Sequence, residues 1–496
     1  MSLATTSDSS FSRNPIRMKL APWQAVALLS PIQHLAMYGG IATGKSFTGS
    51  HFAIDHIEKF PHLTGFIGAN SYDQLNQASL REMFKWLDYY RFEYVINKRP
   101  PDHWGGRQAF PRYDNILSVR SRQTGKPVHI FTRVLSDPDA LRGIEFSWYW
   151  LDETRDTPEN THDVVIGRMR EAKSGYARGL ITTTTFGQDW SYKRFVQGAD
   201  GRTYGAMHIP TSESLRLQII NQIYYDTLLK TYSPLMALQE MEAKHVNVFG
   251  GQAYYSASGR NQSVVAPWYV KGRSGGWAPT KGRPLVVGCD FNYSPAPCIW
   301  MIGQLGPALY NSQGIYWADC IHWFDEIVLT SASTENMTLA LLARYPDFHY
   351  SIYGDVSGGK GTTSNAGEHD YAQMGTILDE AGAQFTIDYD QSNPMVRDRV
   401  ENMNAKFYNA SGQVHQTYNP ERCPHFHGDI LQVGWKPNAV GKLDDGGDKD
   451  RTHATDGAGY AVYKLLPPGR RAMMVDPVGS GIFTGNAGDL IEARLG

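Results

Sequence analysis

The chain has 496 residues, of which 41% are hydrophobic and 19% are charged, and its formal net charge is −2. A chain of this length exceeds one ordinary hydrophobic core, so we expect a globular protein of two or three domains and exclude a disordered chain. The near-neutral charge provides no global basic field for nucleic acid, so a DNA-handling protein of this composition would concentrate positive charge locally.

Targeting signals and cysteines narrow the class further. No apolar run approaches the length of a membrane span, and the polar start "MSLATTSDSSFSRN" lacks a signal-peptide core, so no membrane insertion or secretion is expected. The four cysteines (Cys289, Cys298, Cys320 and Cys423) show no C-x-x-C spacing. Structural zinc and a disulfide framework are therefore disfavoured, and a reducing cytoplasm fits the pattern.

A phosphate-binding loop follows the first apolar run, "HLAM". The pattern G-x-x-x-x-G-K-[ST] is matched by Gly39, Gly40, Ile41, Ala42, Thr43, Gly44, Lys45 and Ser46. In such a loop, backbone N–H groups surround a phosphate, Lys45 reaches the β and γ phosphates, and the Ser46 hydroxyl holds Mg²⁺. A strand-like run before the loop and a helix-compatible run to about Phe60 favour a nucleotide site over a glycine-rich turn.

Strand-like and helix-like segments alternate through the first half of the chain. This alternation predicts an α/β domain with a parallel sheet. After the helix that ends near Phe60, the expected elements are a strand at 64–70, a helix at 71–90, and strands at 115–121, 127–134, 146–153 and 179–185.

Two adjacent acids end the apolar strand "WYWLDE". Asp152 would bind the Mg²⁺ shell, and Glu153 would polarise the attacking water of an ATPase. The alternative is a buried strand that ends in two acids at a helix N-terminus, and the phosphate loop upstream makes this alternative the weaker one.

Three further signals are weaker when each is taken alone. Arg142 precedes the acid-ended strand and suits an arginine finger supplied by a neighbouring subunit, although a surface ion pair explains a single arginine equally simply. Gln24 lies upstream of the phosphate loop, where a glutamine amide suits the adenine edge. Thr182 to Thr185 either sense the γ-phosphate or reflect the ordinary β-propensity of threonine.

The second half begins with a helical stretch over 212–245, followed by a glycine-rich, aromatic passage that resembles a linker. Alternating strands then form a meander, and a helix is expected around 394–407. Asp290 and Asp355 each follow a strand-like run, and Asp456 lies at the front of a late helix. Carboxylates that converge from different elements hold paired divalent ions, although each aspartate alone is more often a cap or turn residue. This layout is that of a ribonuclease-H-like nuclease.

The order of these motifs resembles the large terminase subunit of tailed bacteriophages over about residues 22–466. The matching pieces are "WQ", "GGIATGKS", "LRG…WYWLDE", "TTTTFGQDW", "GCDFNYSP", "YGDVSGG", "NPMVRDRV" and "HATDGAGY". The resemblance implies an N-terminal P-loop (RecA/ASCE-like) ATPase domain with a parallel sheet and helical lid, then a ribonuclease-H-like α/β nuclease domain. The expected limits are an arm at 1–21, the ATPase domain at 22–211, the lid at 212–250, a linker at 251–282, the nuclease domain at 283–466 and a tail at 467–496.

The resemblance also implies a role for each matching residue. Gln24 would lie at the adenine, Lys45 and Ser46 at the phosphates and metal, Asp152 at Mg²⁺, Glu153 as the catalytic carboxylate, Thr183 and Thr184 in the coupling motif, and Asp290, Asp355 and Asp456 as the nuclease acids. Arg142 stands eleven residues before Glu153, where relatives place an arginine that acts on the next subunit's nucleotide.

The implied function is a motor that uses ATP to translocate double-stranded DNA into a procapsid and cleaves concatemeric DNA. Its cofactors would be ATP and Mg²⁺, with Mn²⁺ also supporting the nuclease. Its partners would be the portal protein, the small terminase subunit and further copies in a ring, pentameric by resemblance. Its place would be the host cytoplasm, transiently docked on the procapsid, with no membrane.

Two departures and two rival functions stay open. Ile41, Ala42 and Thr43 provide no arginine within the phosphate loop, and Thr185 or Phe186 stands where relatives often have proline. A repair helicase or translocase-nuclease would usually need a second RecA-like core, and a structural assembly factor would need no intact site residues. Lys98, Arg99, Arg107 and Arg112 are DNA-contact candidates, each also explained by a solvated loop.

Overall fold

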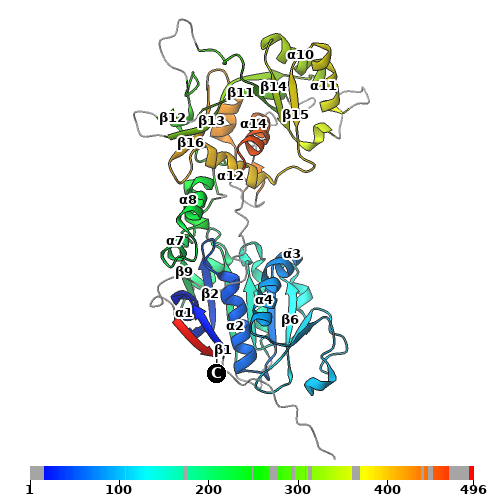
Figure 1. Cartoon of the computed structure of the whole chain (residues 1–496), viewed down its shortest axis with the longest axis vertical. Coiled ribbons are helices and arrows are strands. Elements are labelled where there is room, and N and C mark those ends of the chain that lie inside the picture. Colours follow the sequence, from blue (N-terminus) through cyan, green and yellow to red (C-terminus); the bar gives the residue numbers. More distant parts are fainter. Residues whose placement is uncertain are drawn as a thin grey trace, which may run out of the picture. The chain divides into compact units, whose positions relative to one another are not determined.

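The computed structural model describes residues 16–106, 108–170, 176–248, 250–268, 277–291, 297–307, 309–310, 316–359, 369–436, 441–444, 451–468 and 491–495. The chain forms two compact units (Figure 1). The first contains Met1–Gln222, Leu238–Asn247 and Gly481–Gly496, and the second contains Ile223–Ala237 and Val248–Ser480. The domain limits expected from the sequence stay predictions, and most of the expected tail lies outside the described residues.

The first unit is built on an eight-stranded, mostly parallel sheet. In spatial order its strands are β4 (Tyr94–Ile96), β5 (Ile116–Arg120), β6 (Pro127–Val134), β3 (Gly65–Ala69), β7 (Trp148–Asp152), β8 (Arg178–Thr183), β2 (His34–Gly39) and β9 (Tyr204–Ile209). Every pairing from β6 to β9 is parallel, whereas β4–β5 and β5–β6 are antiparallel. Strand β8 therefore lies between β2, which leads into the phosphate loop, and β7, which ends in Asp152.

Strand β7 shows why this sheet is covered on both faces. Trp148 and Trp150 pack into one core with helix α2 (Lys45–Lys59) and helix α4 (Arg81–Tyr89), whereas Tyr149 and Leu151 pack into a second core on the other face. Parallel strands buried on both faces are continuously apolar instead of alternating, and "WYWL" has this composition. The predicted parallel α/β sheet is confirmed.

The remaining helices of the region before the second sheet are short. They are α1 (Pro22–Leu29), α3 (Tyr72–Gln74), α5 (Glu159–Arg168), α6 (Trp190–Tyr192), α7 (Thr211–Arg216), α8 (Gln222–Thr231) and α9 (Pro234–Glu240). The helix predicted at 71–90 is present, but a π-helical turn at Leu75–Leu80 joins α3 to α4. Strand β1 (Ile16–Leu20) pairs antiparallel with β19 (Ile491–Leu495).

The second unit has a mixed sheet with a distinct strand order. From one edge the strands are β12 (Leu309–Tyr310), β13 (Tyr316–Leu329), β11 (Cys298–Gly306), β10 (Leu285–Asp290), β14 (Tyr350–Gly354) and β15 (Phe385–Asp388), and β16 (Gln413–Tyr418) pairs with β13. The meander β10–β11–β13 is antiparallel, while β14 and β15 continue parallel to β10. Counted in chain order, the five main strands are arranged 3-2-1-4-5, which is the ribonuclease-H-like order that was predicted.

Helices cover both faces of the second sheet. Helices α12 (Val396–Phe407), α13 (Pro424–Gln432) and α14 (His453–Leu465) contribute to one core, and α10 (Thr334–Arg344) and α11 (Asp370–Glu380) contribute to the other. A short two-stranded ribbon joins β17 (Gly434–Trp435) to β18 (Leu443–Asp444). Ala253 and Tyr254, from the expected linker, lie in the core that contains α12 and α14.

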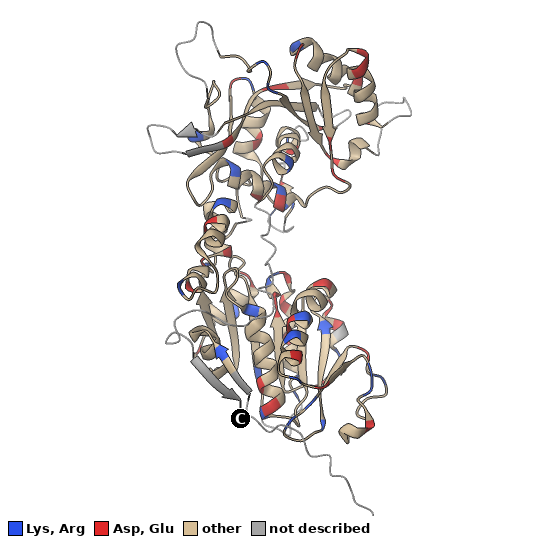
Figure 2. Cartoon of the chain, in the orientation of Figure 1, with Lys and Arg blue, Asp and Glu red and all other residues tan. Residues whose placement is uncertain are grey.

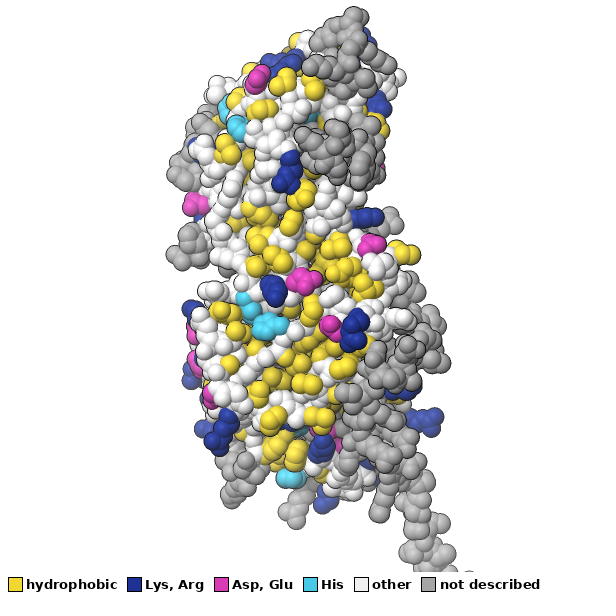
Figure 3. Space-filling view, turned by 90° about the vertical axis from the view of Figure 1, so that its left-hand side faces the viewer, with side chains coloured by type: hydrophobic (Ala, Val, Ile, Leu, Met, Phe, Trp, Pro, Cys, Tyr) yellow, Lys and Arg dark blue, Asp and Glu magenta, His cyan; other side chains and the backbone are white. Residues whose placement is uncertain are grey.

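Charged residues are dispersed over both units. In Figure 2, blue and red residues are interspersed along the ribbons of each unit. On the face drawn in Figure 3, Lys and Arg lie singly among apolar side chains. Positive charge for an anionic partner must therefore come from small local groups of residues, as the composition implied. No helix among the described residues is long and apolar enough to cross a membrane.

Candidate functional site

The phosphate loop connects the end of β2 to the start of α2, and its glycines stand where a side chain would not fit. A Cβ on Gly39 would lie 2.3 Å from Thr43 Oγ1, and one on Gly40 would lie 2.4 Å from the Met241 carbonyl oxygen. Gly44 adopts a φ of 75°, the left-handed region that favours glycine. These three positions keep a tight loop whose backbone reaches the N-terminus of α2, where phosphate binding is favoured.

Four predicted residues meet at this loop. Lys45 Nζ donates a hydrogen bond to the Gly39 carbonyl at 3.0 Å and lies 3.8 Å from Glu153 Oε1. Ser46 Oγ donates to Asp152 Oδ2 at 2.9 Å. The two motifs, which are about a hundred residues apart in sequence, therefore form one site because β2 and β7 end at the same edge of the sheet.

Asp152 is buried and surrounded by hydroxyl donors. Its Oδ1 accepts from Thr182 Oγ1 at 2.7 Å, and its Oδ2 accepts from Ser79 Oγ at 2.9 Å as well as from Ser46. Burial is the main cause that raises the pKa of Asp152 to about 6, and the charge of Glu153 adds to this effect. A cation beside Asp152 would stabilise the charged carboxylate, so the residues present fit the Mg²⁺ that accompanies ATP.

Glu153 has an unusual backbone conformation. Its φ is 50°, in the left-handed region that non-glycine residues seldom adopt. The backbone N–H of Glu153 donates to the Thr182 carbonyl at 2.8 Å, which holds the turn in place. Strained residues of this kind are concentrated at functional sites, because the surrounding structure must impose them.

A second layer of residues, which sequence reasoning missed, fixes the phosphate loop. Thr211 Oγ1 donates to the Ile41 carbonyl at 2.9 Å, and Ser214 Oγ donates to the Ala42 carbonyl at 3.0 Å. The Ile41 N–H donates to the Glu240 carbonyl at 2.8 Å. The Glu240 carboxylate pairs with Arg155 at 2.9 Å. Segments 211–214 and 239–244 thus brace the loop, and only their polar composition could have signalled it.

The threonine run divides into separate roles. Thr182 contacts Asp152, as described, and the Thr183 hydroxyl donates to the Thr184 carbonyl at 3.2 Å. Thr185 Oγ1 donates to the Gln239 carbonyl at 3.2 Å and the Lys244 carbonyl at 2.8 Å. The roles of Thr183 and Thr184 in coupling stay predictions, whereas the hydroxyl that contacts segment 239–244 belongs to Thr185.

Arg142 and Gln24 occupy different surroundings. Arg142 is exposed and its Nε lies 2.7 Å from Asp139 Oδ1, so its ion pair is not with the phosphate loop. Gln24 is buried, its Oε1 accepts from the Ala21 N–H at 2.8 Å, and its Nε2 lies against Gly44. The arginine finger and the adenine contact both stay predictions.

The second candidate site lies at the end of β10, where a glycine contact brings a helix against the sheet. A Cβ on Gly457 of α14 would lie 2.7 Å from the Gly288 carbonyl oxygen, and one on Gly288 would lie 2.5 Å from the Gly457 carbonyl oxygen. This close approach places Asp456 next to Asp290, and Asp355 follows the neighbouring strand β14. All three carboxylates act on the phenol of Tyr460, so the structure brings the predicted acids into one neighbourhood.

Burial and like charges perturb these acids. Burial, with added repulsion from Asp290 and Asp429, raises the pKa of Asp456 to about 7, although the Arg399 guanidinium pairs with it directly and opposes the shift. Burial likewise raises the pKa of Asp355, and Asp290 contributes to that shift. Carboxyls crowded in this way are stabilised in their charged form by cations.

Partners of the acids that sequence reasoning missed include a histidine, an arginine and a fourth carboxyl. His453 Nδ1 lies 2.9 Å from Asp290 Oδ2, and Asp429 accepts from the Thr455 N–H at 3.2 Å. His453 precedes Asp456 by one helical turn, so this spacing was the available signal. Arg399 was visible only as part of "NPMVRDRV".

The fit of this site to divalent metal was tested on its oxygen atoms. Within the described residues, no group of three or more His, Cys, Asp or Glu side chains is arranged to hold an ion as it stands. Asp355 Oδ1 is nevertheless buried and has no hydrogen-bond partner, which is a cost that a bound cation would remove. Carboxylate oxygens are also the ligands that Mg²⁺ and Mn²⁺ prefer, so the residues fit.

The two units together define the fold of a P-loop ATPase joined to a ribonuclease-H-like domain. Solved structures with this arrangement over 90% of the present chain are those of the large terminase from a thermophilic bacteriophage. One crystal form matches with a TM-score of 0.55 at 14% identity and is covered over its full length. The form in complex with ATP-γ-S matches with a TM-score of 0.53 at 13% identity and is 99% covered. The chain therefore has the large terminase fold.

The likeness is structural. No model of a protein family matches the chain, and no curated protein matches it. The roles of individual residues must therefore be argued from this chain's own geometry.

Proposed function

We propose that this protein is a DNA-packaging motor that hydrolyses ATP to translocate double-stranded DNA into a procapsid and cleaves concatemeric DNA with a metal-dependent endonuclease. The observation that carries the proposal is the presence of both sites in one chain: Lys45, Ser46, Asp152 and Glu153 in the first unit, and the three acids around Gly457 in the second. The large terminase fold over 90% of the chain supports it.

In the proposed ATPase, each residue of the first site acts on a different atom. Lys45, which now bonds the Gly39 carbonyl, would turn to the β and γ phosphates and offset their charge. Ser46 and Asp152 would hold Mg²⁺, which neutralises charge that develops on the phosphates. Glu153, on its strained turn, would accept a hydrogen bond from the attacking water and orient it.

Arg142 would act on the nucleotide of a neighbouring subunit. Its exposed side chain and its weak, solvent-screened pair with Asp139 leave it available to a second chain. An arginine finger is worth about 10³-fold or more in rate. The isolated chain would then be a slow ATPase, accelerated when copies form a ring.

In the proposed nuclease, Asp290, Asp355 and Asp456 would hold two Mg²⁺ or Mn²⁺ ions. Paired ions stabilise the attacking and leaving oxygens of a phosphodiester. Asp456 is paired with Arg399, and Asp290 lies beside His453, so both acids must exchange partners before ions bind. We expect weak metal binding without DNA for this reason, which would restrain cutting while DNA moves.

The partners and place in the cell follow from this function. They are double-stranded DNA, the portal of a procapsid, a small terminase subunit and further copies in a ring, in the host cytoplasm. A repair helicase or translocase-nuclease is the alternative. It is disfavoured because the second unit has the 3-2-1-4-5 strand order instead of a second phosphate-loop sheet.

The proposal is tested by separating the two activities. Lys45→Ala and Glu153→Gln should each abolish ATP turnover and translocation, while Glu153→Gln still binds ATP because the amide preserves shape. Asp290→Asn should abolish metal-dependent plasmid nicking and leave ATP hydrolysis intact. Packaging assays with procapsids then distinguish the motor from a repair enzyme, and ATP hydrolysis by Glu153→Gln at the wild-type rate would refute the ATPase assignment.

A further inference from the structure

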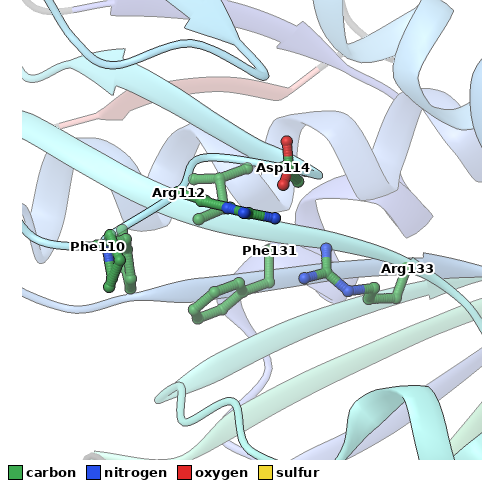
Figure 4. A pocket seen from close by; sticks show the side chains of 7 residues that line it. Phe110, Arg112, Asp114, Phe131 and Arg133 are labelled. Carbon is green, nitrogen blue, oxygen red and sulfur yellow. The ribbon is translucent and has the colours of Figure 1, made fainter.

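A hollow of about 380 Å³ opens on the first unit, away from the residues assigned so far. It is lined by Phe110, Arg112, Asp114, Ile116, Phe131 and Arg133, from β5, β6 and the segment that precedes β5 (Figure 4). Ligand pockets are typically about 300–1,000 Å³. The size therefore suits one nucleotide unit or a similar small group, and not a long stretch of polymer.

Two arginines point into this hollow. Figure 4 shows the guanidinium groups of Arg112 and Arg133 directed toward one another, with the Phe131 ring close by. Arg133 is held in place because its NH1 donates to the Asn115 and Thr132 carbonyls, each at 2.9 Å. One edge of this guanidinium is thus fixed by the backbone while the group lies 6.0 Å from the centre of the Phe131 ring.

The charges of these arginines are not balanced by a contact. Among the described residues, no carboxylate lies within 4.0 Å of the nitrogen atoms of Arg112 or Arg133. Asp114 acts on Arg133 only from farther away, and burial lowers the pKa of Arg133. A partly buried cation without a paired anion is costly, and two cations directed at each other repel. An anionic ligand between them would remove both costs.

The apolar part of the hollow is aromatic. Phe131 and Ile116 are buried and belong to one core of the sheet, and Phe110 packs edge-to-face on Phe131 with ring centres 5.4 Å apart. Phe110 itself is half-buried, so part of its ring remains accessible. Arginines beside aromatic rings form the surface on which single nucleotides of a strand are bound, by charge on the phosphate and stacking on the base.

The hollow also lies at the working edge of the sheet. Arg133 is paired with Gly68 on β3, and Gly68 is paired with Leu151 on β7, one residue before Asp152. Ligands of open α/β sheets bind outside the carboxyl ends of the strands. The hollow therefore opens two strands away from the acids of the ATP site and at a similar level.

We propose that this hollow binds one nucleotide of the DNA that the motor moves, with Arg112 and Arg133 on a backbone phosphate and Phe110 against the adjoining sugar or base. This proposal rests on the proposed function, because it assumes that DNA is the substrate. It names the contact by which the ATPase unit grips DNA. Of the other basic candidates from the sequence, Arg99 pairs with Asp102 at 2.8 Å, and Arg107 lies outside the described residues.

The test measures DNA binding by the full chain carrying Asp290→Asn, so that no DNA is cut. A short fluorescent duplex is titrated at several salt concentrations between about 50 and 200 mM. Loss of one phosphate contact lowers the slope of log K against log salt by about 0.9 and weakens binding about fivefold near physiological salt. Arg112→Gln should show both changes, and Arg112→Lys should largely restore the slope. Arg99→Gln is the matched control, since that arginine is exposed and already paired.

A second arm examines the aromatic side. Phe110→Leu should weaken binding of a single strand more than that of a duplex, because stacking needs an accessible base. Competition with a free mononucleotide separates a site for DNA from a site for nucleotides alone, and displacement of duplex at equimolar mononucleotide would overturn the proposal. An unchanged slope in Arg112→Gln, while the unsubstituted chain binds DNA normally, would also overturn it. Absence of DNA binding by the unsubstituted chain would instead refute the proposed function.

Discussion

The contact between Gly457 and Gly288 yields a quantitative prediction for the nuclease. A Cβ at Gly457 would lie 2.7 Å from the Gly288 carbonyl oxygen, so Gly457→Ala forces helix α14 to retreat by about 0.7 Å to reach an ordinary separation of 3.4 Å. Overpacking of this kind costs about 1–3 kcal/mol, and the gain in helix propensity offsets about 1 kcal/mol. The net free energy of unfolding should therefore fall by about 0–2 kcal/mol.

The effect on cleavage should exceed the effect on stability. Asp456 moves with α14 while Asp290 stays on β10, and a displacement near 1 Å costs on the order of 10²-fold in rate. We expect nicking of supercoiled plasmid in Mg²⁺ to fall at least tenfold at unchanged ATP turnover. Gly428→Ala is the matched control, because its Cβ would meet no atom within 4 Å in helix α13. Wild-type nicking by Gly457→Ala would refute the reasoning that this glycine contact positions the acids.

Three further outcomes are expected. Mixing Arg142→Ala with Lys45→Ala subunits should partly restore ATP turnover in an assembled ring, and no restoration at any ratio would exclude action in trans. Thr185→Val removes the hydroxyl that bonds segment 239–244, so ATP should still be hydrolysed while DNA translocation per ATP falls, and unchanged translocation would contradict this. Burial lowers the pKa of His34 to about 4, so its stabilising contribution is present above its unfolded pKa of about 6.5 and is lost as pH falls toward 4. The first unit should thus lose about 1.4 kcal/mol from this group at pH 5.5, visible as a lower melting temperature that His34→Gln makes less pH-dependent.

Sequence reasoning located what short motifs encode. The phosphate loop and the acids Asp152 and Glu153 were recognisable because each combines a strand-like run with residues of defined chemistry at fixed spacing. The strands β3, β5, β6, β7 and β8 were predicted for the same reason, since their apolar runs are bounded by turns. The order of motifs then led to the fold, which the structure confirms.

The parts that escaped prediction depend on contacts distant in sequence. Ser79 lies in a π-helical turn 73 residues before Asp152, and nothing in its own neighbourhood signals that its hydroxyl bonds that carboxylate. Strand β9 ends in Met-His-Ile and β16 reads QVHQTY, so neither shows the apolar run of a buried strand. The pair formed by Arg399 and Asp456 likewise joins two helices that no local pattern connects.

The indole of Trp150 gives the nucleotide site an optical reporter of its own. The ring is fully buried, its Nε1 donates to Thr182 Oγ1 at 2.7 Å, and the Thr182 hydroxyl donates to Asp152 Oδ1 at 2.7 Å. Any change in the charge or ligation of Asp152 therefore alters the field at this indole through two hydrogen bonds. Nucleotide loading should shift the fluorescence emission of the protein, and Trp150→Phe should remove that shift, so occupancy of the site becomes visible in real time without an added dye.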